Sequence, residues 1–130
     1  MSIGLLMLVA AVQALPAPDA VRWEPLLAGG GTSAEIDPAT IVREGELALY
    51  TVLLRLPAEA AQSGVTMMVM RQAMNCRTRQ IGIRAGAGYD EGGRLVMSRE
   101  TAPADVVYEA YPQDADSERM RRRVCGPAEG

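Results

Sequence analysis

The residues LALYTVLLRL at positions 47–56 form the longest β-prone stretch of this chain, and Pro57 stops it. Apolar residues fall on both faces of this stretch when it is extended, which predicts a central strand covered on each side. The stretch VTMMVMR at 65–71 predicts the next strand. The stretch RTRQIGIR at 77–84 alternates more cleanly between polar and apolar residues, so one of its faces is expected to be wet. These three segments predict the middle of a β-sheet.

Turn residues divide the rest of the chain into further short strands. Pro25 would remove a hydrogen bond from a central strand, so the first strand is expected at an edge of the sheet. The sequences DPAT at 37–40, EGE at 44–46 and YDEGG at 89–93 have the composition of turns. Six strands in sequence order predict an antiparallel meander over residues 23–27, 32–36, 47–56, 65–71, 77–84 and 94–99.

The hydrophobic period becomes helical near the C-terminus. Three residues that make good helix N-caps stand before this segment: Asp114, Asp116 and Ser117. Met120 and Val124 lie four residues apart, so one narrow stripe of the helix is expected to face the sheet. The arginines at 121–123 suit the negative end of the helix dipole and are expected in solvent. Gly126 followed by Pro127 ends the helix.

Cys76 and Cys125 are the only cysteines, and they follow an apolar leader. The apolar run at 3–12 has the length of a signal-peptide core rather than of a membrane span. A signal peptide over residues 1–14 predicts export, a single domain over 15–130 and a disulfide between the two cysteines. The alternatives are a leader that is a buried helix or strand of the domain, and two unpaired cysteines in a cytosolic protein.

The predicted fold class is therefore α+β: an antiparallel β-sheet meander of about six strands, with a short C-terminal helix stapled to it by one disulfide. The formal net charge of −3 gives the chain no attraction to nucleic acid or anionic membranes. The chain contains no histidine, so a Ser or Cys nucleophile lacks its usual base.

We accordingly expect no enzyme, no catalytic residues, no metal and no cofactor. The sequence contains no nucleophile elbow, phosphate loop or zinc-ligand spacing. A hydrolase that uses turn carboxylates is the remote alternative, and its candidate residues are Glu35, Asp37, Glu44, Glu46, Asp90 and Glu91.

Arginine supplies all thirteen basic residues, and five of them form a candidate ligand-binding patch. Arg77 and Arg79 are two apart on a predicted strand, so they project from the same face. Arg84 lies on that strand too, and Arg94 and Arg99 lie on the next one. Such a patch could hold the carboxylate or sulfate groups of an acidic glycan, lipid phosphates or an acidic protein. The alternative is a solvated sheet face balanced by acidic neighbours.

Several motifs follow one another in an order known from one protein family. A tryptophan in the first strand precedes IDPATI at 36–41, and the long strand precedes NCRTR at 75–79. A Tyr-Pro pair at 111–112 then precedes a short helix that ends in VCG at 124–126. Together with the leader, this order resembles the surface-adhesin protein E-like family of exported Gram-negative envelope domains, and the resemblance covers nearly all of residues 15–130.

The resemblance implies an antiparallel sheet with the helix stapled to it, and a homodimer formed through sheet faces or edges. Founding members of the family bind host extracellular-matrix proteins. The sequence departs from the family pattern in several places: Asn75 stands where Asp is usual, and Tyr50 and Tyr108 stand where Trp is usual. The turn at 112–114 reads Pro-Gln-Asp where the family has Pro-Gly-Ser.

The function expected from these observations is a non-enzymatic, adhesin-like binding module of the envelope, in the periplasm or at the cell surface. Its ligand would be a protein or an acidic glycan or lipid, with no nucleic acid, and the domain would not span a membrane once the leader is removed. The alternative is a structural or stress-related periplasmic protein that self-associates through an exposed sheet edge.

Overall fold

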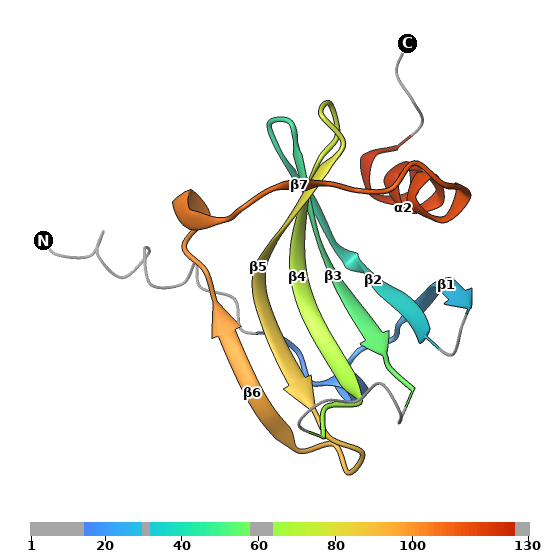
Figure 1. Ribbon diagram of the computed structural model, residues 1–130, viewed down its shortest axis with the longest axis vertical. Helices are drawn as coiled ribbons and strands as arrows, with labels where there is room; N and C mark the ends of the chain where they lie inside the picture. Colours follow the sequence, from blue (N-terminus) through green and yellow to red (C-terminus); the bar gives the residue numbers. More distant parts are fainter. Residues whose placement is uncertain (1–14, 30–31, 58–63, 127–130) are drawn as a thin grey trace, which may run out of the picture.

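The computed structural model describes residues 15–29, 32–57 and 64–126. Within these ranges, consecutive strands lie side by side in one antiparallel sheet (Figure 1): β1 (Glu24–Gly29), β2 (Thr32–Glu44), β3 (Leu47–Arg55), β4 (Met67–Asn75), β5 (Gln80–Tyr89) and β6 (Leu95–Glu100). A two-residue strand, β7 (Glu109–Ala110), pairs with the part of β5 that β6 leaves free. The predicted meander is confirmed. The predicted signal peptide, residues 1–14, lies outside the described residues.

The helix α2 (Ala115–Cys125) packs against β3 and β1 on one side of the sheet, which we call the helix face. Asp114 is its N-cap, and the Asp114 Oδ1 atom accepts a hydrogen bond from the Ser117 N–H at 2.8 Å. Gly126 ends the helix with a φ of +84°, as its sequence position predicts. The Cys76–Cys125 disulfide joins the end of β4 to the end of α2, so the predicted pairing is confirmed.

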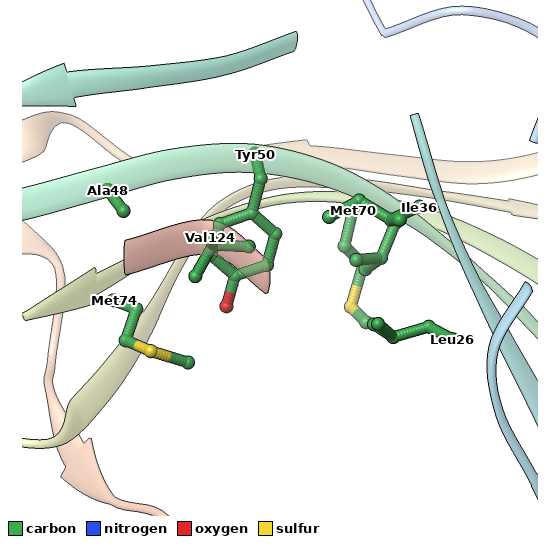
Figure 2. Packing of buried hydrophobic residues seen from close by; sticks show 8 residues of the cluster. Leu26, Ile36, Ala48, Tyr50, Met70, Met74 and Val124 are labelled. Atoms are coloured by element: carbon green, nitrogen blue, oxygen red, sulfur yellow. The ribbon is translucent and has the colours of Figure 1, made fainter. Parts of the chain in front are cut away.

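The hydrophobic core of the helix face forms where α2 crosses the sheet (Figure 2). Tyr50 of β3 is fully buried, with Val124 of α2 and Met74 of β4 packed around its ring. Leu49 and Leu53 point the other way along β3 and are buried as well. The strand at the centre of the sheet is therefore covered on both sides, as its sequence predicts.

Residues 15–23, which include the short 3₁₀ helix η1 (Pro18–Ala20), pass behind the sheet on the face opposite α2 (Figure 1). Leu15 lies beside Ala85 and Ala87 of β5. The Trp23 indole N–H donates a hydrogen bond to the Pro18 carbonyl at 2.6 Å. This segment contributes to the cover of the opposite face. No helix in the described part of the chain is long and apolar enough to cross a membrane.

The turn predicted at 37–40 is wrong, because β2 continues through these residues as a bulged strand. The register between β2 and β3 shifts after Asp37. The Asp37 Oδ1 atom accepts a hydrogen bond from the Ala39 N–H, and the Thr40 hydroxyl accepts one from the Thr51 N–H. The segment does form the side-chain hydrogen bonds that are typical of turns, but they produce a β-bulge and do not end the strand.

The strand predicted at 77–84 begins too early. Residues 76–79 form a tight turn, in which the Asn75 Oδ1 atom accepts hydrogen bonds from the Arg77 and Thr78 N–H groups. Arg79 has a left-handed φ of +60°, and β5 starts only at Gln80. The prediction that Arg77 and Arg79 share one face of a strand is therefore wrong.

The prediction that all three arginines at 121–123 lie in solvent is also wrong. The Arg121 side chain is only 6% exposed and pairs with Glu118, with 2.6 Å between its Nη2 and the Glu118 Oε1 atom. Arg122 and Arg123 are exposed, as expected.

Candidate functional site

The arginines of the predicted patch lie in separate places. Arg77 and Arg79 stand in the β4–β5 turn, where both face carboxylates. The Arg77 Nε atom lies 2.7 Å from a carboxylate oxygen of Glu46, and the Arg79 Nη1 atom lies 4.0 Å from one of Glu118. These two arginines are engaged at the end of the sheet that carries the disulfide.

The other arginines of the patch lie farther along the hairpin. Arg94 stands in the turn before β6 and Arg99 on β6 itself, and neither forms an ion pair with another described residue. Arg84 lies on β5 with its Nη2 atom 3.6 Å from the Glu44 carboxylate. The structure does not bring the five residues together on one surface, and their role in ligand binding stays a prediction.

A groove of about 600 Å³ crosses the part of the helix face that α2 leaves open, over β4, β5 and β6. The groove walls are mostly apolar and include Met68, Met70, Ile81, Ile83, Met97 and Val107. Methionine side chains are flexible and polarizable, so a surface with three of them adapts to differently shaped apolar groups.

The register of β4 and β5 explains why the groove is open. Met68 and Met70 alternate with Val69 and therefore face the same side of the sheet. Met70 lies across from Gly86, and Met68 lies across from Gly88. Each thioether thus faces a position without a side chain. A Cβ atom at Gly86 would still lie 3.8 Å from the nearest atom, Met70 Cγ, so the space above Gly86 is not filled.

Buried polar atoms mark the end of the groove nearest α2. The Tyr50 hydroxyl, the Gln72 Oε1 atom and the Tyr111 hydroxyl are buried without a hydrogen-bond partner among the described residues. Gln72 lies directly across from Tyr50, and both Gln72 and Tyr111 line the groove. A buried polar atom without a partner costs about 1–3 kcal/mol, so a bound polar group would recover part of that free energy.

The two tyrosines are hydrogen-bond donors. Burial raises the pKa of the Tyr50 hydroxyl above its ordinary value, and the neighbouring Tyr111 raises it further. Burial also raises the pKa of Tyr111, although Arg79 and Arg121 act against this shift. Both hydroxyls therefore keep their protons at neutral pH. This end of the groove offers the Tyr111 O–H as a donor beside the Gln72 amide oxygen as an acceptor.

The rim of the groove is charged and ends at an open strand. Arg99, Asp105 and Glu109 supply charges of both signs along it. All six residues of β6 are exposed, and within the described chain β6 pairs with β5 alone. The outer backbone groups of β6 are therefore available to another strand.

Sequence reasoning missed the groove and its polar residues, Gln72 and Tyr111. A signal was present, because Met68, Met70 and Gln72 alternate along one strand while residues 85–88 read AGAG. A row of larger side chains opposite a row of glycines indicates a hollow, but only once the register of the two strands is known.

The turn carboxylates of the hydrolase alternative are dispersed. Glu35 pairs with Arg55, with 2.6 Å between the carboxylate and the Arg55 Nε atom. The Asp90 carboxylate accepts hydrogen bonds from the Gly92 and Arg94 N–H groups in the β5–β6 turn. The described residues contain no group of three His, Cys, Asp or Glu that could hold a metal ion.

Comparison with known proteins covers nearly the whole described domain. The family model of surface-adhesin protein E matches residues 23–126. Among solved structures, crystal form II of Haemophilus influenzae protein E is similar at a TM-score of 0.54 and 11% identity, over 88% of this chain and 96% of that chain. At this identity, the likeness concerns the fold. No similar sequence was found among the curated proteins. The family match extends from Trp23 to Gly126, across β1 to β6, both cysteines and α2, and the chain belongs to the surface-adhesin protein E family.

Proposed function

We propose that this protein is an exported, non-enzymatic binding module of the envelope or cell surface, and that its groove holds a segment of a partner protein. The observation that carries the proposal is the open, methionine-lined groove with unpartnered polar atoms at one end. Family membership supports an adhesin-like role. The disulfide suits an oxidising compartment such as the periplasm or the cell surface.

A peptide segment fits the chemistry of the site better than a purely apolar ligand. The outer edge of β6 offers backbone groups to an added strand, a common mode of peptide recognition. Met97 could receive an apolar side chain of the added strand, and Met68 and Met70 could receive those of residues that continue across the groove. The Tyr111 hydroxyl and the Gln72 oxygen, which both line the groove, complement the C=O and N–H of an amide. Two arginines of the predicted ligand-binding patch, Arg94 and Arg99, flank the apolar part of β6 and could pair with acidic residues of the partner.

Capture experiments with the oxidised protein test this function. Purified extracellular-matrix proteins and envelope fractions would be assayed at low and high salt. Met97→Glu places a carboxylate on the groove wall and is expected to weaken capture about tenfold, which corresponds to about 1.4 kcal/mol. Val42→Glu is the matched control, because Val42 is 46% exposed on the opposite face and Met97 is 49% exposed in the groove. Equal capture by both variants would contradict a role for the groove.

Self-association through β6 is the second candidate function. It is favoured by the exposed apolar residues of β6, Leu95, Val96 and Met97, on a strand whose outer side is open. A homodimer of this kind would make the protein a structural component of the envelope.

A further inference from the structure

Two arginines from neighbouring strands, Arg71 and Arg84, are neighbours in the register on the face of the sheet opposite α2. Arg71 of β4 pairs with Ala85 of β5, and the next residue, Gln72, pairs with Ile83. Arg84 is therefore the extra residue of a β-bulge and has no residue opposite it. A bulge re-aims the side chain that it carries. Arg84 adjoins Ala85, the residue that pairs with Arg71, and the charge of Arg84 lowers the pKa of Arg71.

The hydrogen-bond partners of Arg71 in the described part of the chain are neutral. Its Nη1 atom donates to the Thr40 carbonyl at 2.9 Å and to the Thr51 hydroxyl at 3.1 Å. Arg71 forms no ion pair within the part of the chain that the structure describes. Burial lowers the pKa of Arg71 and the charge of Arg84 lowers it further, whereas Glu44 and Asp37 raise it. Arg71 is thus a half-buried cation beside a second cation.

Arg84 is also incompletely satisfied. Its side chain is only 18% exposed, and its Nε atom is buried without a described hydrogen-bond partner. Among the described residues, the carboxylate that pairs with it is Glu44, which is 3.6 Å away and 57% exposed. A long contact to an exposed carboxylate is weak and easily exchanged for a better one.

The second carboxylate near the pair is held elsewhere. The Asp37 Oδ1 atom accepts a hydrogen bond from the Ala39 N–H at 3.1 Å within the β2 bulge. Asp37 therefore acts on Arg71 at a distance, without a described ion pair to it. Within the described residues, Arg71 donates hydrogen bonds only through Nη1, and the Arg84 Nε atom donates none.

We infer that Arg71 and Arg84 form a binding site for a phosphate or sulfate group on the face opposite the helix. Guanidinium groups bind such oxyanions through paired N–H donors, and two of them match the double charge of the anion. The half-buried setting strengthens these bonds relative to those of a freely solvated arginine. Glu44, which is mostly exposed, would swing into solvent as the anion enters. The site lies on the other side of the sheet from the groove, so it does not depend on the proposed function.

Side-chain NMR of the full oxidised chain tests the site. Every basic residue is arginine, so ¹⁵N-labelled arginine reports on all thirteen cations through their Nε–H signals. Inorganic phosphate and inorganic sulfate would be titrated against chloride at matched ionic strength. Saturable shifts confined to Arg71 and Arg84 are expected. Equal, unsaturable shifts of all the arginine signals would overturn the inference.

Variants of Arg84 make the test specific, because its buried Nε atom has no described partner to lose. Arg84→Gln should abolish the saturable response of Arg71 while the denaturation midpoint stays near that of the wild type. Arg94→Gln, in the exposed β5–β6 turn, is the control because it also removes one positive charge. It should leave the saturable response of Arg71 unchanged. If the Arg71 signal of the Arg84→Gln variant responds to the anion as it does in the wild type, the site is refuted.

The same variants identify the source of the oxyanion. Flotation would be measured with phosphatidylcholine vesicles that contain or lack phosphatidic acid. Flotation that requires both phosphatidic acid and Arg84 assigns the site to a lipid phosphate. A saturable NMR response without flotation assigns it to a soluble phosphate or sulfate ester.

Discussion

Gly82 is the residue that lets the chain after β6 lie close against the sheet. A Cβ atom at this position would overlap the Val106 Cγ1 atom and lie 3.1 Å from the Tyr108 ring. Gly82→Ala should therefore destabilise the fold by about 1–3 kcal/mol, because residues 106–108 would have to move. Gly86→Ala, on the same strand, is the control, since the nearest atom there is 3.8 Å away. Urea denaturation of both variants gives the comparison, and equal losses would disprove close packing at Gly82.

Tyr50 predicts how stability depends on alkaline pH. Its pKa in the folded state is raised, chiefly by burial, above the ordinary value of about 10 that it has in the unfolded chain. The folded state therefore holds this proton at pH values where the unfolded state has lost it. The contribution to stability is complete below pH 10 and decreases as the pH rises above it.

Tyr50→Phe removes both this titration and a buried hydroxyl without a described partner. We expect the variant to be at least as stable as the wild type at pH 7. Its unfolding free energy should decrease less steeply than that of the wild type above about pH 10. Denaturation curves between pH 7 and 11 measure both effects. Parallel curves for the two proteins would show that Tyr50 ionises normally in the fold.

The helix α2 is held to the sheet by a few contacts besides the disulfide. Val124 enters the core, and Arg123 pairs with Glu24 of β1 at 2.6 Å. The Arg43 side chain donates a hydrogen bond to the Cys125 carbonyl. The disulfide closes a loop with a sequence separation of 49, which contributes about 4 kcal/mol in the chain-entropy model. Reduction should therefore loosen α2 before the meander.

Trypsin can report on this order of events. Cleavage after Arg119, Arg122 and Arg123 should accelerate on reduction, because these residues lie on the released helix. Arg94, in the exposed β5–β6 turn, is a cleavage site within the same molecule that α2 does not cover. Its rate should remain unchanged. Equal acceleration at Arg94 would mean that reduction unfolds the whole domain.

Elements with local signals could be predicted from the sequence. The central strand at 47–56 and the helix are examples: Asp114 is one of the three predicted N-caps, and Gly126 is the predicted stop. The bulge at 37–40 could not be predicted, because its turn-like hydrogen bonds are completed by Thr51 from the next strand. The candidate sites could not be predicted either, since they depend on the register of the strands. Met70 faces Gly86, and Arg84 becomes a bulge residue beside the partner of Arg71, only through a particular alignment of β4 with β5.

The molecule as a whole has two unlike sheet edges. The edge at β1 is interrupted by a register shift between Pro25 and Leu27, and α2 packs against that strand. The edge at β6 is exposed, with charged residues at both ends of the apolar run from Leu95 to Met97. Charges beside an apolar edge limit unspecific pairing, so any pairing of β6 must satisfy them. A partner strand and a second copy of the chain would compete for this edge.

The positions of these charges select one register for a symmetric β6–β6 pair. Antiparallel pairing centred on Met97 places Arg94 of each copy opposite Glu100 of the other, whereas centring the pair between Val96 and Met97 opposes Arg94 to Arg99. We expect sedimentation velocity to detect a concentration-dependent dimer that Arg94→Glu or Glu100→Arg each abolish. The double variant exchanges the two charges and should restore the dimer. A double variant that stays monomeric would exclude this register, and a wild type that is monomeric at all concentrations would leave the β6 edge to partner proteins alone.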